Sequence, residues 1–323
     1  MPLTIEHIRA ARERIAPYTV HTPLLRLENL DSLLGCQVYV KLECMQNTGS
    51  FKLRGAMNKI LSLTPEQRAQ GFVAASSGNH GKAVAYAARL LGTSAAIVMP
   101  STAPQLKVDA IRALGAEVVQ CDAPQRFQVA DDLCAQRGAT MIPPFNDELV
   151  MAGQGTAGLE ILEQCPELDA VVVPVSGGGL ISGVSTAVKA LSPSTRVYGA
   201  EPAALPRYTA SLAAGQPTRV EQKKTLADAL VAQIPGELCF PCVAAHVDGF
   251  ADVEDSSMFQ GMKLLLLEGK VLAEPSSGIG IGAVLAGQLP VSPEDKVCFL
   301  ISGGSVGLDQ LDQLKDISIP KRA

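Results

Sequence analysis

The chain has 323 residues, of which 47% are hydrophobic and 18% are charged, and this composition excludes a disordered protein. The length corresponds to about two domains, and one large α/β domain with an insertion would also fit. The formal net charge is -5 and no long stretch concentrates Lys and Arg, which argues against a surface for nucleic acid or for an anionic membrane.

The first expected element is an amphipathic helix near the N-terminus, where Ile5, Ile8 and Ile15 recur among charged residues. It lacks the apolar core of a secretory signal. Two long uncharged runs, residues 170–188 and 275–293, contain Gly and Pro where a membrane helix would be broken. We therefore expect a cytoplasmic protein without a membrane span.

Further along the chain, short apolar runs are separated by segments of helical period. Within the runs, apolar and polar residues do not alternate, which is typical of parallel strands buried on both faces by helices. The expected strands are residues 72–76, 95–99, 117–121, 170–175, 197–200 and 297–301. The expected helices are residues 79–91, 104–114, 154–164, 180–191 and 256–268. The fold class is α/β, and residues 203–247 show no clear period.

Three glycine-rich loops follow expected strands, at residues 76–81, 176–180 and 302–307. A glycine-rich turn between a strand and a helix presents free backbone N–H groups at the positive end of the helix, where a phosphate or carboxylate binds. One such loop would be weak evidence, because tight turns require Gly for their own geometry. Three of them in one chain favour bound anions.

The segment around Lys52 indicates a reactive amine. Thr48 or Ser50 is placed to cap a helix that begins near Phe51, which puts Lys52 in the first turn of that helix. Taken alone, Lys52 would be a solvated surface charge. Beside Phe51 and at the positive end of a helix, however, desolvation and the dipole both disfavour the ammonium form. An amine of lowered pKa is suited to forming a Schiff base with a carbonyl.

Other motifs have competing interpretations. Residues 303–307 match the nucleophile elbow of a hydrolase, but the catalytic His should follow it and the last His is His246. Residues 278–283 resemble a dinucleotide fingerprint, although the next strand does not end in the acidic residue that a ribose requires. Cys239 and Cys242 form a CxxC pair without the second Cys or His cluster of a zinc site.

Four motifs occur in a fixed order along the chain. They are Ser-Phe-Lys-x-Arg-Gly-Ala at 50–56, Ser-Ser-Gly-Asn-His-Gly at 76–81, Ser-Gly-Gly-Gly-Leu at 176–180 and Ser-Gly-Gly at 302–304. In this order and spacing they resemble the fold-type II pyridoxal phosphate (PLP) enzymes. Within these, the chain is similar to the serine racemases and the short threonine/serine dehydratases, from about Ile8 to Leu308.

The resemblance implies an architecture and a cofactor. It implies two parallel-sheet, three-layer domains of the tryptophan synthase β-like type, each with helices on both faces of its sheet. The large PLP-binding domain would comprise residues 1–60 and 145–323, and a small mobile domain would comprise residues 61–144. The family also implies pyridoxal 5'-phosphate as cofactor and a homodimer.

Cofactor-binding roles follow from the resemblance for each matching position. Lys52 would hold PLP as a Schiff base, Phe51 would pack beside the ring, Asn79 would hydrogen-bond the ring 3-hydroxyl, and Ser302 would meet the pyridine nitrogen. The phosphate cradle would consist of Ser176, Gly177, Gly178, Gly179 and Leu180. A hydroxyl at position 302 does not stabilise a protonated ring as a carboxylate does, which favours rapid loss of a β-leaving group.

Substrate contacts are also implied. The loop of Ser76, Ser77, Asn79 and His80 would bind the substrate carboxylate. Serine racemases carry Ser where Ser77 stands, as the acid/base opposite the Lys, whereas many threonine dehydratases have Ala, so racemisation and a carboxylate-binding role for Ser77 both stay open. Arg126 stands where racemase-like enzymes have an Arg that can reach a substrate carboxylate, although an exposed helix position is the commoner explanation for such an Arg.

The divalent-metal site of the racemases is not matched. Glu201 occupies the position of one ligand, but the expected Asp is Arg207. We therefore expect no metal there, and a guanidinium at this place would itself supply positive charge.

These observations predict a PLP-dependent dehydratase, or ammonia-lyase, of β-hydroxy-α-amino acids such as L-threonine, L-serine or a 3-substituted serine such as phenylserine. Its partners would be a small amino-acid substrate and a second copy of the chain, with neither nucleic acid nor membrane. The alternatives within PLP chemistry are an amino-acid racemase and a 3-hydroxyaspartate dehydratase. From other classes, an NAD-dependent oxidoreductase and a non-catalytic PLP-binding protein stay open.

Overall fold

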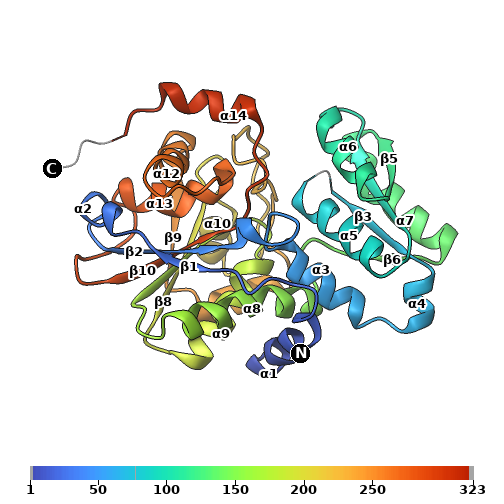
Figure 1. Ribbon diagram of the computed structural model, residues 1–323, viewed down its shortest axis with the longest axis horizontal. Helices are drawn as coiled ribbons and strands as arrows, with labels where there is room; N and C mark the ends of the chain where they lie inside the picture. The colour runs from blue at the N-terminus through green and yellow to red at the C-terminus, as the bar shows by residue number, and fades with distance from the viewer. Residues whose placement is uncertain (1–2, 77, 320–323) are drawn as a thin grey trace.

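The computed structural model describes residues 3–76 and 78–319, and it contains two β-sheets beside each other (Figure 1). Their strands are β1 (Leu24–Arg26), β2 (Gln37–Leu42), β3 (Phe72–Ala75), β4 (Ala95–Pro100), β5 (Glu117–Cys121), β6 (Thr140–Met141), β7 (Ala170–Pro174), β8 (Arg196–Pro202), β9 (Gly249–Val253) and β10 (Lys296–Ile301). The predicted α/β class is confirmed.

The helices lie between the strands in chain order. They are α1 (Ile5–Ile15), α2 (Asp31–Leu34), α3 (Lys52–Leu61), α4 (Pro65–Ala69), α5 (Asn79–Leu90), α6 (Gln105–Ala113), α7 (Arg126–Arg137), α8 (Glu148–Gln164), α9 (Gly179–Leu191), α10 (Arg207–Ala214), α11 (Cys239–His246), α12 (Asp255–Leu267), α13 (Ile279–Leu285) and α14 (Leu308–Gln313). Two short 3-10 helices also border the site, η2 (Glu43–Met45) and η4 (Pro275–Gly278). Within the described residues, no helix is long and apolar enough to cross a membrane.

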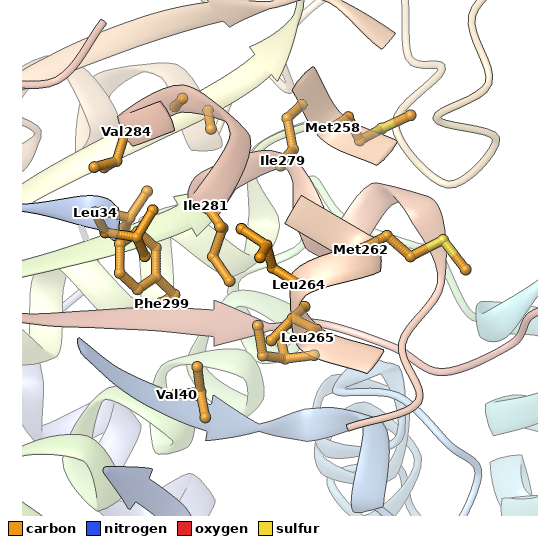
Figure 2. Packing of buried hydrophobic residues seen from close by; sticks show 14 of the residues in the cluster. Leu34, Val40, Met258, Met262, Leu264, Leu265, Ile279, Ile281, Val284 and Phe299 are labelled. Atoms are coloured by element: carbon orange, nitrogen blue, oxygen red, sulfur yellow. The ribbon is translucent and has the colours of Figure 1, made fainter. Parts of the chain in front are cut away.

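The larger sheet has six strands in the order β1-β2-β10-β7-β8-β9, and only the pairing of β1 with β2 is antiparallel. Its central strands are buried on both faces. Val172 and Phe299 face α12 and α13, whereas Val171 and Cys298 face the helices of the opposite layer. Figure 2 shows the first of these layers, where side chains of α12 and α13 pack over β10. We call this sheet and its helices the large unit.

The smaller sheet has four parallel strands in the order β5-β4-β3-β6. Phe72 and Ile97 join a core with α5 and α6 on one face, and Val73 and Val98 pack with α7 on the other. We call this sheet with α5, α6 and α7 the small unit. Helix α3 lies at the junction, because its apolar residues belong to the core of the small unit while its neighbour in the chain, η2, belongs to the large unit. The domain boundaries at residues 60/61 and 144/145 stay a prediction.

Each expected strand and helix is present, with four differences. Helix α8 begins at Glu148 rather than at residue 154, because the Asp147 side chain accepts hydrogen bonds from the N–H groups of Leu149 and Val150 and caps it. Strands β1, β2, β6 and β9 were not predicted, and in β2 and β9 polar residues interrupt the apolar runs. Residues 203–247 contain α10 and α11.

The fourth difference is the start of α3, where the predicted side-chain cap is wrong. The cap residue is Phe51, and the hydroxyl groups of Thr48 and Ser50 are buried without a hydrogen-bond partner. Ser50 instead forms a β-bridge with Gly303, and the Phe51 N–H donates to the Ser302 carbonyl over 3.1 Å. The chain therefore enters α3 from a bridge to the end of β10 rather than from a capping turn.

Candidate active site

The three glycine-rich loops and Lys52 come together because parallel strands bring their carboxyl ends to one edge of a sheet. In the large unit, the loop after β7 and the loop after β10 follow neighbouring strands. The bridge between Ser50 and Gly303, with a further hydrogen bond from the Gly304 N–H to Gly49, places the start of α3 at this edge. The loop after β3 reaches the same place from the small unit, through the contact of Asn79 with Glu274.

Lys52 is the first residue of α3 and is partly buried. Its Nζ donates a hydrogen bond to the Pro144 carbonyl over 2.7 Å and lies 5.1 Å from the centre of the Phe51 ring. Burial lowers the pKa of Lys52 to about 8. The amine is therefore substantially neutral at mildly alkaline pH, as nucleophilic and general-base roles require.

The loop from Ser76 to His80 begins α5 with Gly78 as its cap residue. A Cβ at Gly81 would lie 2.4 Å from the Ser76 carbonyl oxygen, so the backbone turn requires Gly there. His80 is buried, its Nε2 lies 2.8 Å from the Ile142 carbonyl oxygen, and its Nδ1 has no partner. Burial, assisted by the charge of Lys52, lowers the pKa of His80 to about 3, so this imidazole is neutral. Ser77 lies outside the described residues.

Asn79 faces a carboxyl group that the sequence analysis did not single out. The Asn79 Nδ2 lies 3.0 and 2.9 Å from the two oxygens of Glu274, while the Asn79 Oδ1 is buried without a partner. Glu274 is 3% exposed, and burial raises its pKa to about 7. One signal pointed to it, since Glu274 is the only charged residue between positions 271 and 287.

The loop after β7 has the shape of an anion cradle. Gly178 adopts a φ of 103°, and a Cβ there would lie 1.8 Å from the Tyr208 hydroxyl oxygen, so only Gly fits. At Gly177 a Cβ would meet the ring of Phe145 at 2.5 Å. The loop leads directly into α9, a helix of 13 residues whose first N–H groups lack helical partners. The Ser176 hydroxyl accepts from the backbone N–H of Ala232 over 3.2 Å.

Ser302 directly follows β10 and is 4% exposed. Its hydroxyl lies 3.1 Å from that of Ser277, which in turn accepts from the Gly303 N–H over 2.9 Å. Ser277 was not predicted, because nothing in the sequence separates it from the neighbouring Ser276. Its hydroxyl holds Ser302 as part of a neutral pair rather than beside an acid.

Arg126 begins α7 in the small unit. Its guanidinium stacks 4.7 Å from the centre of the Phe127 ring, and Phe127 is exposed. Among the described contacts, none joins Arg126 to the loops of the site. Its predicted contact with a substrate carboxylate stays a prediction.

Arg207 is fully buried at the start of α10. It donates to the carbonyl groups of Val175 and Leu230 over 2.9 and 3.0 Å, and its Nη1 lies 4.0 Å from Glu201. Glu201 accepts the backbone N–H groups of Tyr208 and Thr209. Over residues 3–76 and 78–319, no group of three or more metal-binding side chains is present.

Two of the motifs that suggested other classes, residues 278–283 and the Cys239/Cys242 pair, have structural explanations. A Cβ at Gly278 would lie 2.4 Å from the backbone N of Met262, so this Gly permits close packing of η4 against α12. Cys239 and Cys242 are free and buried at the start of α11, and burial raises the pKa of the Cys239 thiol to about 11.

The groups at this edge of the large sheet fit pyridoxal phosphate. A dianion would find the α9 N-terminus and the cradle that Gly177 and Gly178 leave open. The Lys52 amine is the group that would form a Schiff base with the aldehyde of the cofactor. The unpartnered buried atoms Asn79 Oδ1, Ser50 Oγ and His80 Nδ1 are polar groups that a bound molecule would satisfy. The fold and this site define the protein as an α/β enzyme of the class that uses pyridoxal phosphate.

Comparisons with known proteins agree with this class. Residues 15–303 match the family described as "Pyridoxal-phosphate dependent enzyme". The L-threonine ammonia-lyase of Thermotoga maritima is 41% identical over 97% of this chain and 78% of its own length. The L-threo-3-hydroxyaspartate ammonia-lyase of Saccharomyces cerevisiae is 39% identical over 92% of each chain. The solved structure of maize serine racemase superposes with a TM-score of 0.92 and 40% identity over 97% of each chain.

The chain belongs to the family of pyridoxal-phosphate dependent enzymes. The predicted fold-type II architecture and the predicted cofactor are confirmed. The predicted lyase class is confirmed as well, since relatives of this identity and coverage are ammonia-lyases and dehydratases.

Proposed function

We propose that this enzyme dehydrates and deaminates a β-hydroxy-α-amino acid, with Lys52 as the base that removes the Cα proton. Bound pyridoxal phosphate supplies an electron sink that acidifies this proton. The observation that supports this most directly is the position of Lys52, whose amine has a lowered pKa and which begins α3 where the three glycine-rich loops come together. L-Threonine and L-serine are the first candidate substrates.

The residues of the site divide the work between binding and proton transfer. Backbone N–H groups at the start of α5 bind the substrate carboxylate, and the neutral imidazole of His80 adds no charge there. Lys52 takes the Cα proton, the Cα–Cβ double bond forms and the β-hydroxyl leaves as water after protonation. Hydrolysis of the released enamine then gives a 2-oxo acid and ammonia, which accounts for every atom.

The test is release of 2-oxo acid from a panel of β-hydroxy amino acids. We expect Lys52→Ala to lower turnover by at least about a hundredfold, because base and cofactor attachment are lost together. Exposed Lys223→Ala is the matched control and should keep full activity. Near-normal turnover by Lys52→Ala would contradict the role of Lys52. A wild-type protein that gains no visible absorption band on incubation with pyridoxal phosphate would contradict the proposed cofactor site.

Racemisation is the second candidate, favoured by the Ser at position 77 and by the likeness to maize serine racemase. A two-base racemisation needs a proton donor on the face of the substrate opposite Lys52, and Ser77 is proposed for it. Chiral chromatography of the same incubations distinguishes the two, since D-amino acid accumulates only if racemisation occurs.

A dicarboxylate such as 3-hydroxyaspartate belongs in the panel, because Arg126 is the proposed contact for a second carboxylate.

We also propose a small mobile domain of residues 61–144, a cytoplasmic location and a homodimer. All eight cysteines are free, which is typical of a reducing compartment. Light scattering on the purified protein measures the oligomeric state, and a monomer would contradict the homodimer.

A further inference from the structure

The carboxyl group of Glu274 is buried but does not cap the helix that it precedes. Glu274 is the cap residue of η4, yet its side chain makes no capping hydrogen bond. It reaches instead to the Asn79 amide nitrogen at 3.0 and 2.9 Å, and it accepts the Ser305 N–H over 3.2 Å. Burial of a carboxyl group is costly, so these contacts need a purpose beyond local structure.

These contacts connect the two units. Asn79 is the first residue of α5 in the small unit, whereas Glu274 and Ser305 belong to the large unit. A Cβ at Gly303 would lie 2.7 Å from a Glu274 oxygen and 2.9 Å from the Asn79 Nδ2. The three residues are therefore packed against one another, and Gly303 permits this approach.

We propose that Glu274 is a positioning residue for the cofactor ring, because it fixes the orientation of the Asn79 carboxamide next to the loop that begins with Ser302. The proposal rests on the proposed site, in which Asn79 contacts the ring. Rotating the carboxamide would turn its oxygen toward the Glu274 oxygens, and two acceptors would then face each other. The unpartnered Asn79 Oδ1 is thereby held in one orientation.

The charges around Glu274 are consistent with this role. Asp228 raises its pKa, whereas the contacts with Asn79 and Ser305 and the charge of Lys107 lower it. Lys107 and Asp228 pair with each other at 3.0 Å, on opposite units. The negative charge of Glu274 also acts on Lys52, where it favours the ammonium form and so raises the pKa of the lysine.

The experiment is a double-mutant cycle on cofactor affinity, measured by titrating the apoprotein with pyridoxal phosphate. We expect Glu274→Ala and Asn79→Ala each to raise the Kd about tenfold and to shift the visible absorption band in the same direction. The double variant should bind no more weakly than Asn79→Ala, because Glu274 acts through Asn79. Exposed Glu221→Ala is the control for loss of a negative charge.

Two results would overturn the proposal. One is a Kd increase in the double variant equal to the product of the two single increases, and the other is a Glu274→Ala protein with the wild-type Kd and absorption band. If Glu274→Ala does not fold, Glu274→Gln replaces it. Its amide keeps one acceptor for Asn79, so a loss of about threefold with the same band shift is expected, and wild-type behaviour would overturn the inference. The titration needs no substrate, so a failure of the dehydration assay leaves this result intact, and Lys52→Ala tests the site itself.

Discussion

Gly178 shows how a single residue shapes the proposed phosphate cradle. Its φ of 103° lies in the region that favours Gly, and the Tyr208 hydroxyl, which donates to the Gly177 carbonyl over 3.1 Å, occupies the space where a side chain would start. Position 178 is therefore restricted twice, by its backbone and by its neighbour.

We expect Gly178→Ala to raise the Kd for pyridoxal phosphate at least about tenfold, because the loop must move to separate the new Cβ from Tyr208. Gly215→Ala is the matched control, since Gly215 also has a positive φ of 69° but nothing within 4 Å of its would-be Cβ. Both variants bear the cost of a left-handed Ala, about 1–2 kcal/mol. Equal cofactor affinity in the two proteins would contradict the role of the Tyr208 contact.

At the scale of elements, a buried ion network fixes the helix that carries Lys52. Arg54, on α3, pairs with Glu43 of η2 at 2.7 Å and with Glu160 of α8 at 2.6 Å. Lys41 of β2 pairs with Glu160 at 2.6 Å. Two positive and two negative groups balance, so the network holds three helical elements and one strand together without net charge.

Arg54→Leu should destabilise the fold by about 3–5 kcal/mol, because two carboxylates then share the single charge of Lys41 in a buried setting. Urea unfolding measures this as a lower midpoint at unchanged m-value. Arg137→Ala removes an exposed ion pair with Glu117 and should cost less than about 1 kcal/mol. Losses of similar size in the two variants would show that the network contributes no more than a surface pair.

At the scale of the whole molecule, the charge of Arg207 affects whether the enzyme requires a divalent cation. Its guanidinium lies among the Val175 and Leu230 carbonyl groups and near Glu201, which are oxygen groups of the kind that hold divalent cations. Because the Arg207 guanidinium already supplies positive charge to these oxygen groups, a divalent cation is not needed there.

We therefore expect EDTA to leave the turnover of the holoenzyme unchanged within about twofold, since Arg207 already balances these groups electrostatically. The measurement is 2-oxo acid release before and after dialysis against the chelator, at constant monovalent salt. A large loss in EDTA that Mg²⁺ restores would show that a divalent cation binds in spite of Arg207.

Much of the fold was predictable because it depends on local patterns. Non-alternating apolar runs identified the central strands, and the glycine-rich loops were recognisable because their backbone geometry needs Gly wherever they occur. Strand β2 escaped prediction because Lys41 interrupts its apolar run, and that lysine is buried only because Glu160 neutralises it. The helix start near Phe51 was correct, but the predicted side-chain cap of α3 was wrong, because a bridge to Gly303, which is distant in sequence, replaced the local cap.

By itself, the sequence determined the α/β class and the family, since the apolar runs are local and the family motifs are short and keep their order along the chain. The tertiary structure decided which residues meet across the units. Glu274 reaches Asn79 over 195 positions of sequence, and Arg207 becomes a buried cation beside Glu201. Such contacts follow from the order of strands and from helix packing, which bring distant residues together and which local periodicity does not encode.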